Sequence, residues 1–266
     1  MESRKLNFLL DFFYQIYSYR EYLLQSVLRD MRVKYKRSAL GYLWTMLHPL
    51  AMMTVLAVVF SQIMRVPIRD YAIFLFAGLL PWNYFHSTAL MSLGNIRANS
   101  RLIGQIPVPK YIFLVSITFS NLVNLVLALV PLLALMIFFG HPIEPTVLAF
   151  PFVLLPLYLT TIAVALILAT SNVFFDDTLH LAEVGLQALY FLSPVLYGRD
   201  MLPPRLVDIL MLNPLFHQIE FMRDIFYYGR LPDAAAYSIS LGISLACLSL
   251  ALYIFRRAEN KFLYFI

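Results

Sequence analysis

Six long apolar stretches constrain this chain more than any other feature of its sequence. The only Asp, Glu, Lys or Arg inside them is Glu183. Roughly 20 residues of α-helix cross a hydrocarbon core about 30 Å thick, and a helix satisfies its own backbone amides in lipid. The sequence therefore predicts an all-α membrane protein whose six transmembrane helices occupy residues 41–64, 71–94, 112–139, 146–170, 181–197 and 235–255.

The composition agrees with a single membrane domain. The chain is 61% apolar and 13% charged, which is about half the charged fraction of a soluble domain. We therefore expect one polytopic domain over residues 1–266. The single cysteine, Cys247, lies in the last stretch and leaves no intrachain disulfide or cysteine metal site. Because roughly forty polar and aromatic residues precede the first stretch, we expect no cleavable signal.

Basic residues predict the orientation. If the six spans alternate, 14 of the 20 Lys and Arg residues fall on the side that holds both termini. Short flanking loops rich in Lys and Arg stay in the cytoplasm, so we expect both termini there. The net charge of +5 is explained by this orientation, and no basic stripe outside the membrane flanks suggests a nucleic-acid partner.

The segment before the first stretch is amphipathic over residues 11–31. Ile16, Leu23, Val27 and Met31 recur at helical spacing, with charged and polar residues between them. Such a helix, interleaved with tyrosines, is expected to lie on the cytoplasmic leaflet. Its polar face could in addition dock a cytoplasmic partner.

A basic run that includes Lys34, Lys36 and Arg37 follows this helix. Its simplest role is to orient the first span, and it could also attract anionic phosphate groups at the membrane surface. The loop after the second stretch carries Arg97 and Arg101, and a short helix is expected near 96–104, where a soluble motor protein could bind.

Two further segments have unusual patterns. Residues 204–212 and 214–228 predict two short amphipathic helices separated by Asn213 and Pro214, and neither is long enough to cross a bilayer. They either gate a pore mouth or cover the ends of other helices. The adjacent Asp176 and Asp177 lack the His, Glu or Cys neighbours of a metal site, so we expect a helix cap or a partner contact.

Several motifs are absent from the sequence. It has no phosphate-binding P-loop, no nucleophile elbow and no His-Glu-x-x-His helix. We therefore expect no catalytic residue, no metal and no ATP site in this chain. Glu183 lies near the cytoplasmic end of its stretch, and the absence of deeper ionisable partners argues against ion-coupled transport.

Aromatic residues instead populate the predicted spans. Aromatic faces stack on the C–H surfaces of sugar rings, and weak repeated contacts suit a polymer that must slide. The alternative is an ordinary aromatic belt at the membrane interface. The candidates for a sugar path are Tyr42, Trp44, Trp82, Tyr84, Phe85 and Tyr190.

Four ordered motifs resemble those of one family. They are the run from Arg29 to Trp44 continuing into Leu47-His48-Pro49-Leu50, then Gly78-Leu-Leu-Pro81-Trp82-Asn-Tyr-Phe85, Ser193-Pro194-Val-Leu-Tyr197, and Asn213-Pro214. Together, over essentially the whole chain, they are similar to the permease subunits of ABC-type polysaccharide exporters, which export O-antigen, capsule or teichoic acid.

The resemblance implies a transporter subunit of the bacterial cytoplasmic (inner) membrane. Such permeases form homodimers, bind two copies of a separate ATPase subunit that holds ATP and Mg, and move a glycan linked to undecaprenyl diphosphate. A lipid or drug exporter of similar architecture is the alternative. A membrane-embedded glycosyltransferase or acyltransferase is a third possibility, for which Asp176, Asp177 and His180 are the only candidate residues.

The resemblance also implies roles for particular residues. By position, the contacts with the ATPase would be made by Arg20, Arg29, Arg97 and Arg101. The lipid diphosphate would enter near Lys34, Lys36 and Arg37. The external gate would include Ile209, Asn213, Pro214, Phe216 and Met222.

Overall fold

The computed structural model describes residues 8–34, 40–41, 43–105 and 108–265, and within these ranges it contains helices and no strand. The elements in chain order are α1 (Phe8–Ser18), α2 (Arg20–Lys34), α3 (Leu43–Met64), α4 (Ile68–Leu93), α5 (Asn95–Ala98), α6 (Ser100–Gln105), α7 (Tyr111–Phe139), η1 (Pro145–Ala149), α8 (Phe150–Phe174), α9 (Thr178–Phe191), η2 (Arg199–Met201), α10 (Pro204–Leu210), α11 (Pro214–Phe226), α12 (Ala234–Ala258) and η3 (Glu259–Tyr264). The all-α prediction is confirmed for this part of the chain.

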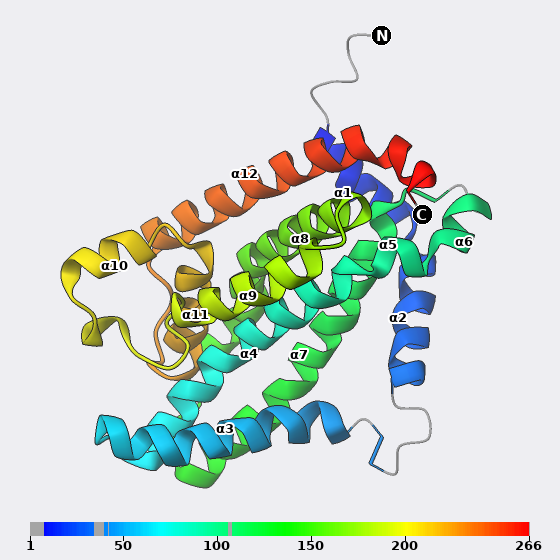
Figure 1. Ribbon diagram of the computed structural model, residues 1–266. Coiled ribbons are helices and arrows are strands. Elements are labelled where there is room, and N and C mark those ends of the chain that lie inside the picture. Colours follow the sequence, from blue (N-terminus) through cyan, green and yellow to red (C-terminus); the bar gives the residue numbers. More distant parts are fainter. Residues whose placement is uncertain (1–7, 35–39, 42, 106–107, 266) are drawn as a thin grey trace.

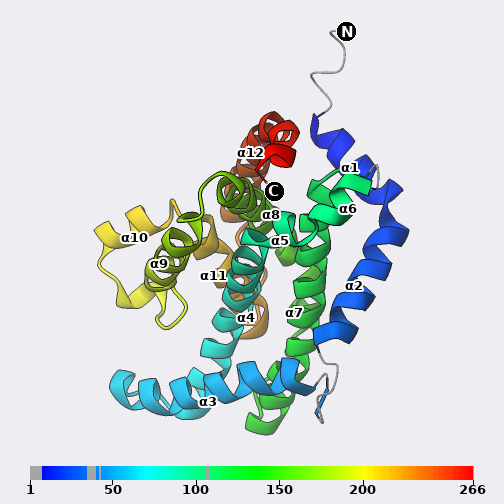
Figure 2. The ribbon, with the colours of Figure 1, turned by 45° about the vertical axis from the view of Figure 1, so that its right-hand side comes forward.

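The long helices α4, α7, α8 and α12 form a bundle (Figures 1 and 2). Helix α4 lies at its centre and packs against α3, α7, α8 and α11, so that most of its side chains between Tyr71 and Leu93 are buried. Helix α12 pairs most extensively with α8. At its start, Asp233 caps the helix by accepting a hydrogen bond from the backbone amide of Ala236 at 2.9 Å.

The bundle has two ends, which we name by what lies there (Figure 1). The termini end holds α1, α5, α6 and η3, and the hairpin end holds α10 and α11. At the termini end, Arg256 of α12 pairs with Asp11 of α1 at 2.5 Å, and Lys110 donates a hydrogen bond to the Glu259 carbonyl. These contacts bring both ends of the described chain to one end of the bundle.

Four segments are long and apolar enough to cross a membrane: Leu43–Ile63, Tyr111–Phe139, Pro145–Phe174 and Ala234–Phe262. The chain is therefore a multi-pass membrane protein. Helix α4, with 26 residues, also has the necessary length, but polar residues such as Asn83 and His86 make it less apolar than those four. The predicted count of six spans is thus not confirmed by length and composition.

The predicted helix at residues 181–197 is the clearest error. Helix α9 starts at Thr178, ends at Phe191 and contains only 14 residues, after which the chain turns. Pro194 accounts for this end, because proline disfavours helical conformation in the preceding residue and cannot donate an intrahelical hydrogen bond. Hydropathy did not reveal the end because Val195 and Leu196 are apolar and buried beyond it.

Helix α3 is placed differently from the other long helices. It crosses α4 and α7 at a steep angle in both views (Figures 1 and 2). Met53 and Ala57 are buried against the bundle, whereas Val55, Val59 and Ile63 are exposed. In this single chain, most of the apolar surface of α3 therefore contacts no protein.

The amphipathic segment predicted at residues 11–31 is two helices, α1 and α2, that meet at Tyr19. Helix α2 packs along the first half of α7. The ring of Tyr22 lies edge-on to Phe113 at 5.9 Å, and Ser120 donates a hydrogen bond to Asp30 at 3.1 Å. Part of the polar face of α2 is therefore occupied by a contact within the chain.

Candidate functional site

A cavity of about 820 Å³ opens between α3, α4 and α7, and Tyr190 of α9 also lines it. We call it the aromatic cavity. On α3 its lining includes Trp44, His48, Met52 and Leu56, which are spaced four residues apart and therefore share one helix face. Its lining contains no Asp, Glu, Lys or Arg among the described residues.

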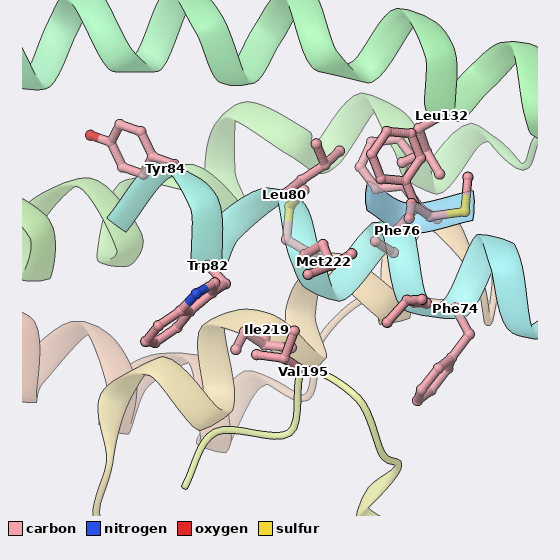
Figure 3. Close-up of a cluster of buried hydrophobic side chains, with 14 of the residues drawn as sticks. Phe74, Phe76, Leu80, Trp82, Tyr84, Leu132, Val195, Ile219 and Met222 are labelled. Carbon is pink, nitrogen blue, oxygen red and sulfur yellow. The ribbon is translucent and has the colours of Figure 1, made fainter. Parts of the chain in front are cut away.

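The aromatic cavity gathers most of the aromatic residues predicted for a sugar path. Trp44, Trp82, Tyr84 and Tyr190 all line it. The rings of Trp82 and Tyr190 meet edge-to-face at 5.2 Å and 60°. Figure 3 shows that Trp82 and Tyr84 leave α4 in different directions, so they contribute to different parts of the wall.

The two other predicted aromatics do not line this cavity in the described structure. Phe85 is 2% exposed and packs in the core around α4, with its ring 5.9 Å from that of Trp82. Tyr42 lies outside the described residues.

Uncharged polar groups complete the wall, and sequence reasoning assigned no role to several of them. Asn83, Asn121, Asn124, His48 and His86 all line the aromatic cavity. Asn124 donates a hydrogen bond to Asn121 at 3.3 Å, while the Asn124 side-chain oxygen is buried with no hydrogen-bond partner among the described residues. For Asn83 and His86 the available signal was their spacing of three residues, which places both on one helix face.

The chemistry of this wall favours a neutral ligand with hydroxyl groups. Aromatic rings offer flat apolar faces, and the amides offer both donors and acceptors. An unsatisfied amide in an apolar environment costs free energy, so a ligand hydroxyl that pairs with Asn124 would relieve that cost. Because the described lining contains no charged side chain, it offers no cation to which an anionic group could bind.

The four arginines predicted to contact an ATPase differ in their local partners. Arg97 pairs with Asp176 at 2.5 Å and donates to the Val173 carbonyl at 3.3 Å. Arg29 pairs with Asp30 at 3.1 Å, whereas Arg101 on α6 is exposed. Arg20, also on the surface, lies over the ring of Tyr17 at 4.6 Å.

The basic residues predicted at the point where a lipid diphosphate enters fall at the edge of the described structure. Lys34 is the last residue of α2. Lys36 and Arg37 lie outside the described residues. Their role stays a prediction.

The two short helices predicted after residue 203 are present as α10 and α11. Asn213 caps α11 by accepting from the Leu215 amide at 3.0 Å, and Pro214 occupies the first turn. Of the predicted gate residues, Ile209 is exposed, whereas Phe216 and Met222 are buried. These two side chains therefore serve packing in this conformation.

Helix α11 packs within the bundle, against α4, α8 and α12. Gln218 is fully buried there and donates to the Thr160 hydroxyl at 2.8 Å and the Pro156 carbonyl at 3.1 Å. Sequence reasoning also missed the burial of Arg223, which lies within the predicted helix at residues 214–228 and is 0% exposed.

A second, polar cavity of about 620 Å³ lies at the hairpin end. Its lining includes Asp200, His217, Asp224 and Arg230. Burial raises the pKa of Asp224, and the bond from Arg230 at 2.7 Å opposes that shift. Burial lowers the pKa of His217, which keeps its imidazole neutral at pH 7.

The described residues provide no cluster of three His, Cys, Asp or Glu side chains that could hold a metal ion. Asp176 is committed to its ion pair with Arg97, and His180 lies 3.8 Å from Glu183 on an exposed helix face. The residues considered for a glycosyltransferase or acyltransferase therefore do not form a joint site in this structure.

Comparisons with known proteins identify the family. The model of the ABC-2 type transporter family matches residues 22–227. The chain is 33% identical to the O-antigen export system permease protein RfbA of Myxococcus xanthus, over 93% of this chain and 96% of that protein. It is 32% identical to the permease of the same name from Klebsiella pneumoniae, over 76% and 79%. It is 26% identical to the polysialic acid transport protein KpsM of Escherichia coli, over 89% and 93%. The resemblance noted in the sequence is thus confirmed, and the chain belongs to the ABC-2 type transporter family.

Proposed function

We propose that this chain is the membrane-spanning subunit of an ATP-driven exporter that moves a lipid-linked polysaccharide, such as O-antigen, across the bacterial inner membrane. The names of its relatives support polysaccharide as the cargo. The structural observation that carries the proposal is the aromatic cavity, whose rings and amides suit sugar rings and hydroxyls.

In this proposal two copies of the chain form the transport path. The apolar surfaces of α3 and α9 support this assembly: Val55 and Val59, and Leu181 and Val184, are exposed in the single chain. Exposed apolar surface of this extent on a membrane protein is covered either by lipid or by another subunit.

The energy comes from two copies of a separate ATPase chain, which holds ATP and Mg and binds the termini end. Arg20 at the start of α2, next to α1, and Arg101 of α6 are exposed, and the place of α1 and α6 at that end (Figure 1) supports this placement. Undecaprenyl diphosphate carries the glycan and enters near Lys34, Lys36 and Arg37. The α10–α11 hairpin closes the outer end.

Replacing cavity aromatics tests the cargo. A ring contact contributes roughly 1 kcal/mol, which corresponds to about fivefold in affinity. We expect Trp44→Ala and Tyr190→Ala each to lower surface polysaccharide about fivefold at equal permease levels, measured by gel separation of labelled glycan. Phe138→Ala removes an exposed ring of α7 that does not line the cavity and should leave export unchanged.

The same variants separate polysaccharide from a smaller cargo. In an exporter of lipids or drugs, Trp44→Ala changes the efflux of a small apolar substrate and leaves the amount and length of surface glycan unaltered. Wild-type glycan in both cavity variants would contradict the proposed function.

A further inference from the structure

The turn between α9 and η2, residues 192–198, has backbone carbonyls that no helix satisfies. Val195 is fully buried and Leu196 is 9% exposed. Buried carbonyl groups need hydrogen-bond partners, and irregular backbone at membrane depth is tolerated only where protein or water supplies them. The groups that donate hydrogen bonds to these carbonyls therefore fix the position of the turn.

Two side chains from other helices bind three consecutive carbonyls of the turn. Arg223 of α11 donates from Nη2 to Val195 at 2.8 Å and from Nη1 to Tyr197 at 3.1 Å. Tyr71 of α4 donates its hydroxyl to the Leu196 carbonyl at 2.8 Å. The turn is thereby fixed to both α11 and α4.

The guanidinium of Arg223 is fully buried and bound on several sides. Nη1 also contacts Glu220 at 2.7 Å, Nε donates to the Phe74 carbonyl at 3.4 Å, and Cζ lies 3.6 Å from the centre of the Phe74 ring. A buried charge persists only when it is paired and hydrogen-bonded. The planar fork of arginine makes these bonds simultaneously, which the point charge of lysine does not.

Gly78 provides the space for this guanidinium. A Cβ atom at residue 78 would lie 2.8 Å from Nη2 of Arg223 and 3.1 Å from the Val195 carbonyl oxygen. Figure 3 shows Val195 beside α4 and near Ile219 of α11. Gly78 and the Ser193–Tyr197 segment, which lie 115 residues or more apart in the chain, therefore meet at Arg223.

The turn continues directly into the wall of the aromatic cavity. The Tyr197 hydroxyl donates to the Phe191 carbonyl at 2.7 Å, which ties the turn back to the end of α9. Tyr190 precedes Phe191, and its ring meets Trp82 at 5.2 Å. Displacing the turn would therefore move Tyr190 relative to Trp82.

We propose that Arg223 is a positioning residue for the aromatic cavity: it fixes the 192–198 turn and thereby holds Tyr190 against Trp82. The proposal rests on the proposed function only for the identity of the cargo. In this proposal, Arg223 does not line the aromatic cavity. It nevertheless controls the shape of that cavity through the turn.

Trp82 offers a direct readout, because Trp44 is the only other tryptophan of the chain. In a Trp44→Phe protein purified in lipid nanodiscs, we would measure the emission maximum of Trp82 and its quenching by acrylamide. We expect Arg223→Lys to raise the quenching constant about twofold and to shift the emission to the red. Tyr71→Phe, which removes only the bond to Leu196, should produce a smaller shift in the same direction.

Arg230→Gln is the matched control. Arg230 also pairs with a carboxylate of α11, at 2.7 Å from Asp224, but it makes no hydrogen bond or ion pair with the described residues of the turn. The Arg230→Gln variant should therefore leave Trp82 emission unchanged. If Arg223→Lys does not fold, Tyr71→Phe and Gly78→Ala decide the question. A lower melting temperature with unaltered Trp82 emission in the folded variants would reduce Arg223 to a purely structural role and overturn the proposal.

The outcome is separable from that of the proposed function. A shift in Trp82 emission needs no cargo, so it would support the role of Arg223 even if Trp44→Ala left polysaccharide export intact. Conversely, Trp44→Ala could abolish export while Trp82 emission stays unchanged in the Arg223 and Tyr71 variants. That result would support polysaccharide as the cargo and reject the positioning role of Arg223.

Discussion

At the scale of single residues, the ion pair between Arg97 and Asp176 changes how a basic loop is interpreted. The two side chains lie 2.5 Å apart and connect α5 to the turn before α9, with 40% and 79% of their surfaces exposed. Exposed pairs contribute about 0–1 kcal/mol to stability. The pair therefore serves to orient the loop more than to stabilise the protein, and a substitution at Arg97 affects Asp176 as well as any docking partner.

Exchanging the two charges separates these effects. We expect Arg97→Asp to lower export and the co-purification of the ATPase severalfold, and the added Asp176→Arg to restore both, because the pair is formed again in reverse. Arg101→Glu, at an exposed residue with no ion pair to the described part of the chain, should reduce co-purification without being rescued by Asp176→Arg. Failure of the exchange to restore export would mean that Arg97 contacts the ATPase directly.

At the scale of elements, the sequence predicted those helix boundaries that depend on residues close together in the chain. Asn213 and Pro214 separate α10 from α11 as expected, because a capping side chain and a proline at the first turn act within a few residues. The end of α9 escaped prediction, because Val195 and Leu196 extend the apolar pattern beyond Phe191. The proline at 194 was the available signal.

Long-range contacts account for the rest of what the sequence did not predict. Nothing near Arg223 in the chain indicates that its partners are the carbonyls of Phe74, Val195 and Tyr197. The aromatic cavity was anticipated in part through Trp44, Trp82, Tyr84 and Tyr190. Their convergence depends on α3 crossing α4 and α7, which hydropathy does not encode.

The α10–α11 hairpin should be sensitive to acid through His217. Burial and the nearby Arg199 lower the pKa of His217, while the Met211 carbonyl and Glu220 act in the opposite direction. A folded-state pKa below the unfolded value of about 6.5 means that the folded state binds fewer protons. The stability that neutral His217 contributes is present above pH about 6.5 and falls as the pH drops below that value.

Hydrogen exchange of residues 214–226 checks this dependence. After correction for the intrinsic effect of pH on exchange, we expect less protection at pH 5.5 than at pH 7.5 in the wild-type chain. His217→Gln, which cannot titrate, should show little difference between the two conditions. An equal pH dependence in the His217→Gln protein would assign the effect to another group, such as Asp224.

At the scale of the whole molecule, successive long helices run in alternating directions between the two ends of the bundle. Helices α4, α8 and α12 run from the hairpin end to the termini end, whereas α7 and α9 run the opposite way (Figures 1 and 2). The pairing of Arg256 with Asp11 at 2.5 Å returns α12 to α1. A sixth passage would have to be supplied by α3, and α9, with 14 residues, needs the turn that follows it to complete its passage.

Cysteine labelling in intact cells tests this topology together with the predicted orientation. Cys247 is the only native cysteine, so single cysteines can be placed in a Cys247→Ser chain. Tyr264→Cys and Phe175→Cys mark the termini end, and Leu212→Cys marks the hairpin end; the three native side chains are 86%, 70% and 77% exposed. With both termini in the cytoplasm, a membrane-impermeant maleimide should label Leu212→Cys directly, and the other two only after permeabilisation. Labelling of Tyr264→Cys in intact cells would show that the orientation is the reverse of the predicted one. Labelling of Phe175→Cys but not of Tyr264→Cys would show that the chain crosses the membrane an odd number of times between residues 175 and 264.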